Sequence, residues 1–183
     1  AIDWALGRDD SAGTFLAVYT AEFRESQSRM ALEGSVDLEI QEETISLYVK
    51  EVASDVLYLA ATQCLAEGLE TGDFEAVAHT FRIFGEARER YAQLRFLAPD
   101  GMELVRVNVD ASGARIVPPE ELQDKSNRYY FQESRGLQDG EFYVSPLDLN
   151  IEQGRIEQPE NPMIRFTSPI YHKDEYRGLL VLN

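Results

Sequence analysis

Apolar residues recur every three or four positions over the first half of the chain. Tyr48, Val52, Val56 and Leu59 share one face of a helix. Acidic residues lie towards the start of this pattern, where the helix dipole favours negative charge. The spacing therefore predicts one long amphipathic helix over 35–66.

Two starting points fit this helix. Gly34 and Ser35 have the residue types of an N-cap. However, Phe15 and Tyr19 also share a helical face, so the helix could instead begin near Thr14. The first 34 residues are accordingly expected to form a helical arm, to which the pattern assigns no role.

The periodicity changes in the second half of the chain. After Gly72 a second helix is predicted over 74–91, and from 94 onward short β-rich runs alternate with Pro, Gly, Asp and Asn. Helices followed by strands predict an α+β fold, with a sheet domain over 94–183. The strands are predicted at 94–97, 103–109, 115–117, 142–144, 163–171 and 177–182, with short helices at 120–124 and 128–135 and a long irregular connection at 145–162.

Charge and composition exclude several classes of function. Seventeen Lys and Arg against 33 Asp and Glu give a net charge of −16, which disfavours nucleic acid or an anionic membrane as a partner. Cys64 is the single cysteine, and His79 and His172 lie far apart, so neither an internal disulfide nor a Cys/His metal cluster is expected. No apolar run reaches the roughly 18 residues of a membrane span.

Catalytic motifs are not recognisable either. Ser145 lacks the Gly-x-Ser-x-Gly setting of a hydrolase nucleophile, and the chain has no glycine-rich phosphate cradle. We therefore expect a non-catalytic domain without a metal or a cofactor.

The densest chemical feature is an aromatic stretch that contains Arg128, Tyr130, Phe131 and Tyr143. Tyrosine offers an apolar ring with a hydroxyl, and arginine offers a planar fork of donors that matches a carboxylate. Two interpretations stay open. The residues either form a pocket for a small anion, or they pack in the core while Arg128 pairs with Glu133 or another acid.

Arg165 is a second candidate. On a strand, Arg165 and Thr167 point to one face while Phe166 points to the other. If both faces are covered, Arg165 is a buried cation that needs a partner, because an unpaired buried charge is costly. That partner is either a ligand carboxylate or one of the chain's own acids, Asp148 or Glu157.

The second half of the chain resembles the Cache, or PDC, extracytoplasmic sensor domains of bacterial histidine kinases, diguanylate cyclases and chemoreceptors. The resemblance covers about 35–183 and is especially similar to the membrane-distal module of a double-Cache kinase sensor. In such a sensor a second module follows the equivalent of Asn183, and membrane segments flank the region. The resemblance is carried in order by 95–108, 121–131, 141–150 with 156–159, 162–170 and 178–183.

This resemblance implies a long N-terminal helix, a five-stranded antiparallel PAS-like sheet, and a ligand pocket between that sheet and the short helices of the connection. The family's Arg-x-Tyr-Phe pattern, whose residues commonly contact a ligand carboxylate, is matched by Arg128, Tyr130 and Phe131. The strand positions that can line the pocket are matched by Ser145, Arg165 and Thr167.

The expected function is that of a periplasmic sensing domain of an inner-membrane receptor such as a histidine kinase. It would bind a small carboxylate or an amino acid and relay the signal through the N-terminal helix, which could also pair two copies of the chain. The alternative is a structural or dimerisation module that binds no ligand and receives its signal from a partner protein.

Overall fold

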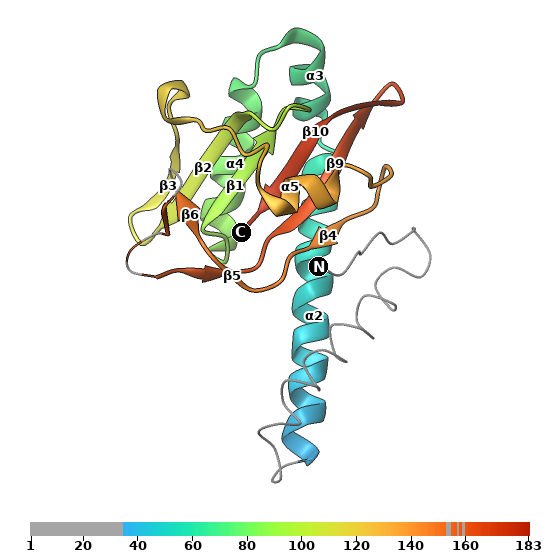
Figure 1. Cartoon of the computed structure of the whole chain (residues 1–183), viewed down its shortest axis with the longest axis vertical. Coiled ribbons are helices and arrows are strands. Elements are labelled where there is room, and N and C mark those ends of the chain that lie inside the picture. Colours follow the sequence, from blue (N-terminus) through green and yellow to red (C-terminus); the bar gives the residue numbers. More distant parts are fainter. Residues whose placement is uncertain (1–34, 153–154, 157, 159) are drawn as a thin grey trace.

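The computed structural model describes residues 35–152, 155–156, 158 and 160–183, and it confirms the predicted order of helices followed by strands (Figure 1). The helices at the start are α2 Ser35–Ala60, α3 Gln63–Thr71 and α4 Glu75–Arg88. The predicted arm over 1–34, and with it the alternative helix start near Thr14, lies outside the described residues.

The prediction of one helix over 35–66 was wrong in its last part. Helix α2 ends at Ala60 and α3 begins at Gln63, because Thr62 between them adopts extended backbone angles with φ −70° and ψ 141°. The Thr62 hydroxyl donates a hydrogen bond of 2.8 Å to the carbonyl of Leu59. When a side-chain hydroxyl donates to a carbonyl at the end of a helix, it can take the place of the backbone N–H that would continue the helix.

The next two helix ends also follow from backbone geometry. Gly72 adopts the left-handed φ of 77° that glycine tolerates well, and it ends α3 where the sequence predicted a stop. Helix α4 is shorter than the predicted 74–91, because Glu89 takes a left-handed φ of 46° and directs the chain into the sheet.

The strands form an antiparallel sheet of six strands, where the resemblance implied five, in the order β3-β2-β1-β10-β9-β4. The shortest strand, β4, pairs with β9 through Tyr143 opposite Thr167 and Val144 opposite Phe166. The strands of this sheet are β1 Gln93–Leu97, β2 Glu103–Asp110, β3 Gly113–Ile116, β4 Tyr143–Val144, β9 Phe166–His172 and β10 Glu175–Leu182.

The long connection between β3 and β9 contains short elements of its own. Strand β5 pairs with β8, and β6 pairs with β7, so the stretch predicted as irregular holds two small two-stranded pairs. The elements of the connection, besides β4, are η1 Pro119–Glu121, α5 Tyr129–Ser134, β5 Asp148–Leu149, β6 Ile151–Glu152, β7 Arg155–Ile156 and β8 Pro162–Met163.

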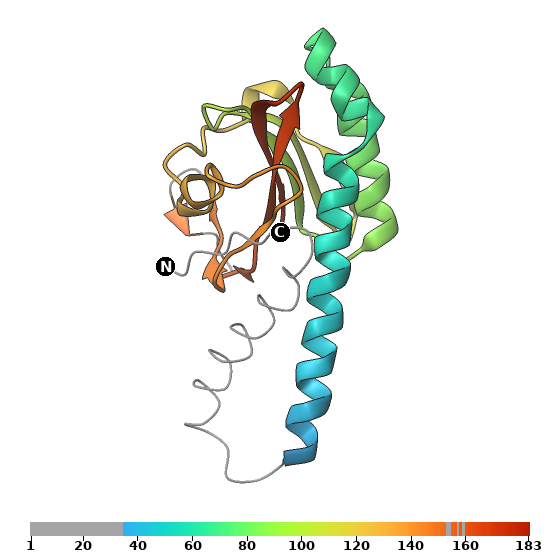
Figure 2. The same cartoon turned by 90° about the vertical axis from the view of Figure 1, so that its right-hand side faces the viewer.

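Both faces of the sheet are covered. Helices α2 and α4 lie on one face, and α5 with its connection lies on the other (Figure 2). In β10, Leu180 and Leu182 belong to the core on the helical side, whereas Leu179 and Val181 pack with α5. This alternation is that of a strand between two layers. A charged side chain on either face of the central strands is therefore buried.

Polar contacts hold α2 to the rest of the domain. The buried carboxylate of Asp55 accepts hydrogen bonds from Arg88 at 2.7 Å and from the hydroxyl of Tyr91 at 2.6 Å. Burial, and then the bond to Asp55, raises the pKa of Tyr91 well above its usual value. Nearer the start of α2, Glu51 accepts a hydrogen bond of 2.6 Å from Arg90.

A second polar contact holds α5 to the sheet. The hydroxyl of Ser134 donates to the carbonyl of Tyr130 at 2.6 Å, and it lies 2.6 Å from the hydroxyl of Thr167 on β9. Because the Ser134 proton is used within α5, the Thr167 hydroxyl is the donor of the second bond. Both side chains are buried, so this pair fixes the helix that follows Arg128 against β9.

The hydrogen bond between Asp55 and Tyr91 predicts a measurable loss of stability when the Tyr91 hydroxyl is removed. Tyr91→Phe should lower the free energy of unfolding by about 1.5–3 kcal/mol, the usual worth of a buried hydrogen bond to a charged group. Tyr58→Phe is the matched control, because Tyr58 lies on α2 like Asp55 but has 62% of its surface exposed. Equal effects of the two substitutions in urea denaturation would contradict the proposed anchor.

The contact of Ser134 with Thr167 predicts coupling between two substitutions. Ser134→Ala and Thr167→Val should each cost about 1–2 kcal/mol of unfolding free energy, because the first leaves the buried Thr167 hydroxyl without its acceptor and the second leaves the Ser134 oxygen without its donor. The double variant should cost less than the sum, since the second change removes a group that has already lost its partner. Strict additivity in denaturant titrations would show that α5 is held by other contacts.

Candidate functional site

Tyr130 is the centre of a group of arginine side chains from three parts of the chain. Arg95 on β1 donates a hydrogen bond of 3.2 Å to the Tyr130 hydroxyl. The guanidinium carbons of Arg165 and Arg128 lie 5.2 and 5.9 Å from the centre of its ring, within the range of cation–π attraction. We call Arg95, Arg128, Tyr130 and Arg165 the arginine–tyrosine site.

The local folding explains this convergence. Arg128 stands at the N-cap of α5 in extended conformation, so its side chain lies beside the first turn, where Tyr130 is 1% exposed. Arg95 and Arg165 lie on the face of the sheet opposite Phe96 and Phe166, which pack in the core on the helical side. The covering of this face by α5 therefore places the phenol ring among guanidinium groups.

Arg165 is buried with only long contacts to its guanidinium group. Its side chain is 1% exposed, and it donates to the Tyr129 hydroxyl at 3.4 Å and to the Asn150 amide oxygen at 3.5 Å. Both distances are at the outer limit of a hydrogen bond. The Nε atom has no hydrogen-bond partner among the described residues. Among the described residues, the guanidinium group therefore has no short hydrogen bond.

The electrostatic surroundings of Arg165 agree with this geometry. Burial is the main influence, and it lowers the pKa of Arg165 from its usual value. The phenols of Tyr129 and Tyr130 act in the opposite sense and raise this pKa. Arg95 and Arg128 lower the pKa again, because like charges disfavour each other. An anion placed among these arginines would be stabilised by all of them.

The carboxylate of Asp148 lies between two of the arginines. Its Oδ2 atom is 3.6 Å from Nη1 of Arg165 and 3.8 Å from Nη2 of Arg128. Of the partners considered from sequence, Asp148 is therefore near both arginines, whereas Glu157 lies outside the described residues. Both separations are longer than a hydrogen bond, so Asp148 neutralises the pair only loosely.

A buried ion cluster adjoins the arginine–tyrosine site. Arg106 donates to Oε2 of Glu103 at 3.2 Å, and the backbone N–H of Gln123 donates to the same oxygen at 2.9 Å. The Nε atom of Arg95 lies 3.5 Å from the other oxygen of Glu103, and Lys125 lies 4.0 Å from it. Arg95 thus belongs to both groups and connects them.

Sequence reasoning missed this ion cluster. Arg95 and Arg106 each stand between apolar neighbours in a strand, which is the signal that identified Arg165 as a buried cation. Glu103 was harder to place, because a register shift between Phe96 and Leu97 puts it opposite Leu97, on the face that α5 covers. Strand alternation counted from the sequence does not contain such a shift.

Two of the predicted pocket residues have a positioning role in the structure. Ser145 accepts a hydrogen bond of 2.9 Å from the backbone N–H of Arg165, and its own N–H donates to the Arg165 carbonyl at 2.8 Å. Ser145 therefore fixes the backbone from which the Arg165 side chain extends. Thr167 contacts Ser134 and so fixes α5, as described above.

The two remaining predicted residues pack in the hydrophobic cluster beneath α5. Phe131 and Tyr143 are buried there, and they share the cluster with Tyr130. The structure thus brings Arg128, Tyr130 and Arg165 together, while Phe131 on α5 and Tyr143 on β4 share a hydrophobic cluster with Tyr130. The other members of this cluster are Leu97, Leu137, Leu179 and Val181, with Tyr129 partly buried against it.

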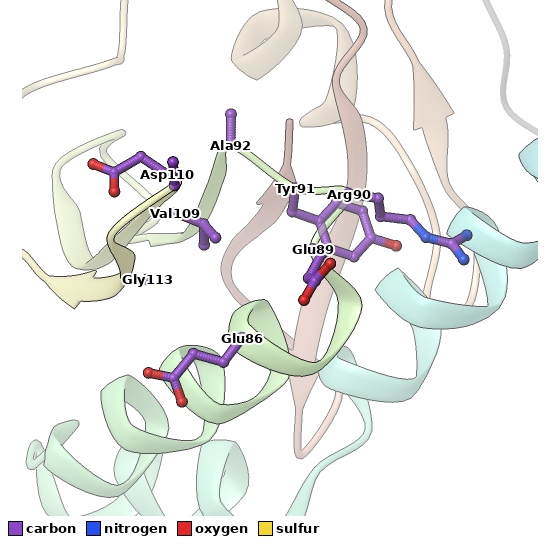
Figure 3. A pocket seen from close by; sticks show the side chains of 9 residues that line it. Glu86, Glu89, Arg90, Tyr91, Ala92, Val109, Asp110 and Gly113 are labelled. Atoms are coloured by element: carbon purple, nitrogen blue, oxygen red, sulfur yellow. The ribbon is translucent and has the colours of Figure 1, made fainter.

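A cavity formed by described residues lies elsewhere, between the end of α4 and the hairpin of β2 and β3. It measures about 580 Å³ and is lined by Glu86, Glu89 and Asp110 among others. Figure 3 shows these carboxylates around it, with Arg90 pointing away, towards its partner Glu51 on α2. A small carboxylate would meet like charges there, so this cavity does not suit an anion.

In the part of the chain that the structure describes, no three His, Cys, Asp or Glu side chains are grouped to hold a metal ion. None of the helices in that part has both the length and the apolar character of a membrane span.

Comparisons with known proteins place the chain in a family. A family model described as the sensor domain of bacterial histidine kinases matches residues 29–183. The chain is also similar to the extracellular domain of a protein assigned as a histidine kinase, with 26% identity and a TM-score of 0.66, over 94% of this chain and 56% of the other. No curated protein matches the chain.

Two further solved structures are similar. A domain of a protein assigned to the sensory box/GGDEF family of Vibrio parahaemolyticus has 26% identity and a TM-score of 0.66, over 94% of this chain and 59% of the other. The sensory domain of the Campylobacter jejuni chemoreceptor Tlp3, with isoleucine bound, shares the fold at 13% identity and a TM-score of 0.57, over 96% and 63%. The chain spans less than two thirds of each of these structures. It belongs to the family of bacterial histidine kinase sensor domains.

Proposed function

We propose that this domain senses a small molecule with a carboxylate group, either a simple carboxylate or an amino acid, and that it binds this molecule at the arginine–tyrosine site. The observation that carries the proposal is the buried guanidinium group of Arg165, whose contacts to described side chains are all 3.4 Å or longer. A carboxylate offers such a group two short, parallel hydrogen bonds. The Tlp3 sensory domain, which shares the fold, has been solved with isoleucine and with L-valine bound.

The acidic surface does not prevent such binding. A net charge of −16 repels anions at long range, but salt screens this repulsion over roughly 8–10 Å. Inside that distance the guanidinium groups of Arg128 and Arg165 are the nearest charges. A zwitterionic amino acid would feel the long-range field less than a simple carboxylate would.

The relay in this proposal runs through the sheet to α2. Tyr130 lies on α5, Thr167 connects α5 to β9, and α2 packs on β9 and β10 from the opposite side. The N-terminal part of α2 extends well beyond the sheet (Figure 2), so a small tilt would be amplified along the helix. A ligand shifts such an equilibrium only through its different affinities for the two arrangements.

In this proposal the domain lies outside the cytoplasmic membrane, as the extracellular domains it resembles do. It is anchored through its parent receptor and carries out no catalysis itself. A kinase or cyclase output would belong to the parent protein.

One observation favours the alternative of a dimerisation module. Leu47, Tyr48 and Tyr58 on α2 expose large apolar surfaces, as a helix that pairs with a second copy would. Under this alternative, two α2 helices would associate and no small molecule would be needed.

A thermal unfolding screen separates the two functions. Among small carboxylates and amino acids, a true ligand at about 100 times its dissociation constant should stabilise the domain by about 2.7 kcal/mol. Arg128→Ala should abolish this shift and keep the fold, because the Arg128 side chain is 20% exposed and not part of the core. Arg115→Ala, at an exposed arginine on β3, is the matched control and should respond like the wild type.

A full response of Arg128→Ala would show that the ligand binds elsewhere. If no compound stabilises the wild type and the chain sediments as a dimer, the dimerisation module is the better account.

A further inference from the structure

We propose that the carboxylate of Asp148 stands where the carboxylate of the ligand binds, and that the ligand displaces it from between Arg128 and Arg165. This inference rests on the proposed sensing function and adds the chemical class of the ligand. The site would accept a carboxylate that carries no ammonium group beside it.

The first step of the argument is the geometry around Asp148. One of its oxygens lies 3.6 Å from Arg165 and 3.8 Å from Arg128. Apart from these two ion pairs, its side chain accepts no hydrogen bond from the residues that the structure describes. A negative charge is thus placed between two guanidinium groups at the position where an anion is most stabilised, but without short hydrogen bonds to either.

The second step is that Asp148 is weakly held. It belongs to β5, which is two residues long and pairs with the equally short β8 rather than with the six-stranded sheet. Its side chain is 36% exposed, whereas that of Arg165 is 1% exposed. A partly exposed ion pair is worth little, typically under about 1 kcal/mol. An outside carboxylate that makes short hydrogen bonds to Arg128 and Arg165 can therefore replace it.

The third step compares the opposite role for Asp148, in which it would hold the ammonium group of an amino acid. The charged groups of described residues within 4 Å of its Oδ2 atom are both cations. Arg95, which donates to the Tyr130 hydroxyl, adds a further positive charge nearby. An ammonium group bound at Asp148 would enter this positive field, and like charges at such distances repel. Displacement of Asp148 by an anion avoids that conflict.

Chemical rescue with acetate tests whether this position accepts an outside carboxylate. Asp148→Ala removes the side-chain carboxylate, and acetate is a small anion that carries the same charged group. Acetate at tens of millimolar should raise the melting temperature of Asp148→Ala by a few degrees more than sodium chloride at equal ionic strength. The wild type and Asp139→Ala, at an exposed acid in the loop before β4, should show a clearly smaller difference, because Asp148 still competes with acetate in both. Equal responses of all three proteins would overturn the inference.

A second measurement tests the ligand class with matched pairs of compounds. Propionate and L-alanine share a carbon skeleton and differ by the ammonium group, as do succinate and L-aspartate. In calorimetric titrations the wild type should bind the acid without the ammonium group more tightly in each pair. Asp148→Asn should increase that affinity roughly three- to tenfold, because the competing charge is gone. Asp139→Asn should leave it unchanged.

The outcomes distinguish this inference from the proposed function. If the wild type binds the amino acids and Asp148→Asn weakens them, Asp148 holds an ammonium group, and the inference fails while the sensing function stands. If none of the four compounds binds the wild type and acetate rescues no variant, both the inference and the proposed carboxylate site fail. Circular dichroism of each variant checks that the fold is kept.

Discussion

The burial of guanidinium groups between a sheet and a helix is the constraint on which the rest of the site depends. A sheet covered on both faces has no solvent-exposed side on its central strands, so Arg95 and Arg165 must be stabilised inside the protein. Tyr130 contributes its ring and hydroxyl, and Glu103 contributes one carboxylate. Arg95 faces the buried carboxylate of Glu103, whereas Arg165 faces the partly exposed Asp148, and the proposed function places an outside anion beside Arg165 for this reason.

The same layers connect this place to the helix that would carry a signal. Strand β9 contacts α5 on one face through Thr167, and it packs against α2 on the other face. On the helical side, α2 is held through Asp55 and Glu51 to Arg88 at the end of α4 and to residues between α4 and β1. A change in the position of α5 can therefore reach α2 through a single strand.

Much of this architecture could be predicted from the sequence, because hydrophobic periodicity reports secondary structure directly. It identified both groups of helices and, with shifted bounds, each strand of the main sheet. Alternation predicted a buried cation at Arg165 on the condition that both faces of its strand are covered, and the structure meets this condition. The break at Thr62 could not be predicted, since it depends on one side-chain hydrogen bond to Leu59. The small strands of the connection are too short to produce a periodic pattern.

The candidate site was predicted only in part, because local sequence patterns identify some of its residues and not others. Arg128 and Tyr130 were found because they stand together in the sequence, and Arg165 because it interrupts an apolar strand. Glu103 comes close to Arg95 only in the folded chain, through a register shift, and Lys125 comes close to Glu103 through a loop. No local sequence pattern predicts either contact.

The most direct test of the account is a crystal structure of the domain with the carboxylate that stabilises it most. We expect the carboxylate group of this ligand between the guanidinium groups of Arg128 and Arg165, close to the ring of Tyr130, with the side chain of Asp148 turned away. A ligand bound in the acid-lined cavity near Glu86 and Glu89, with Arg165 still paired to Asp148, would contradict the account.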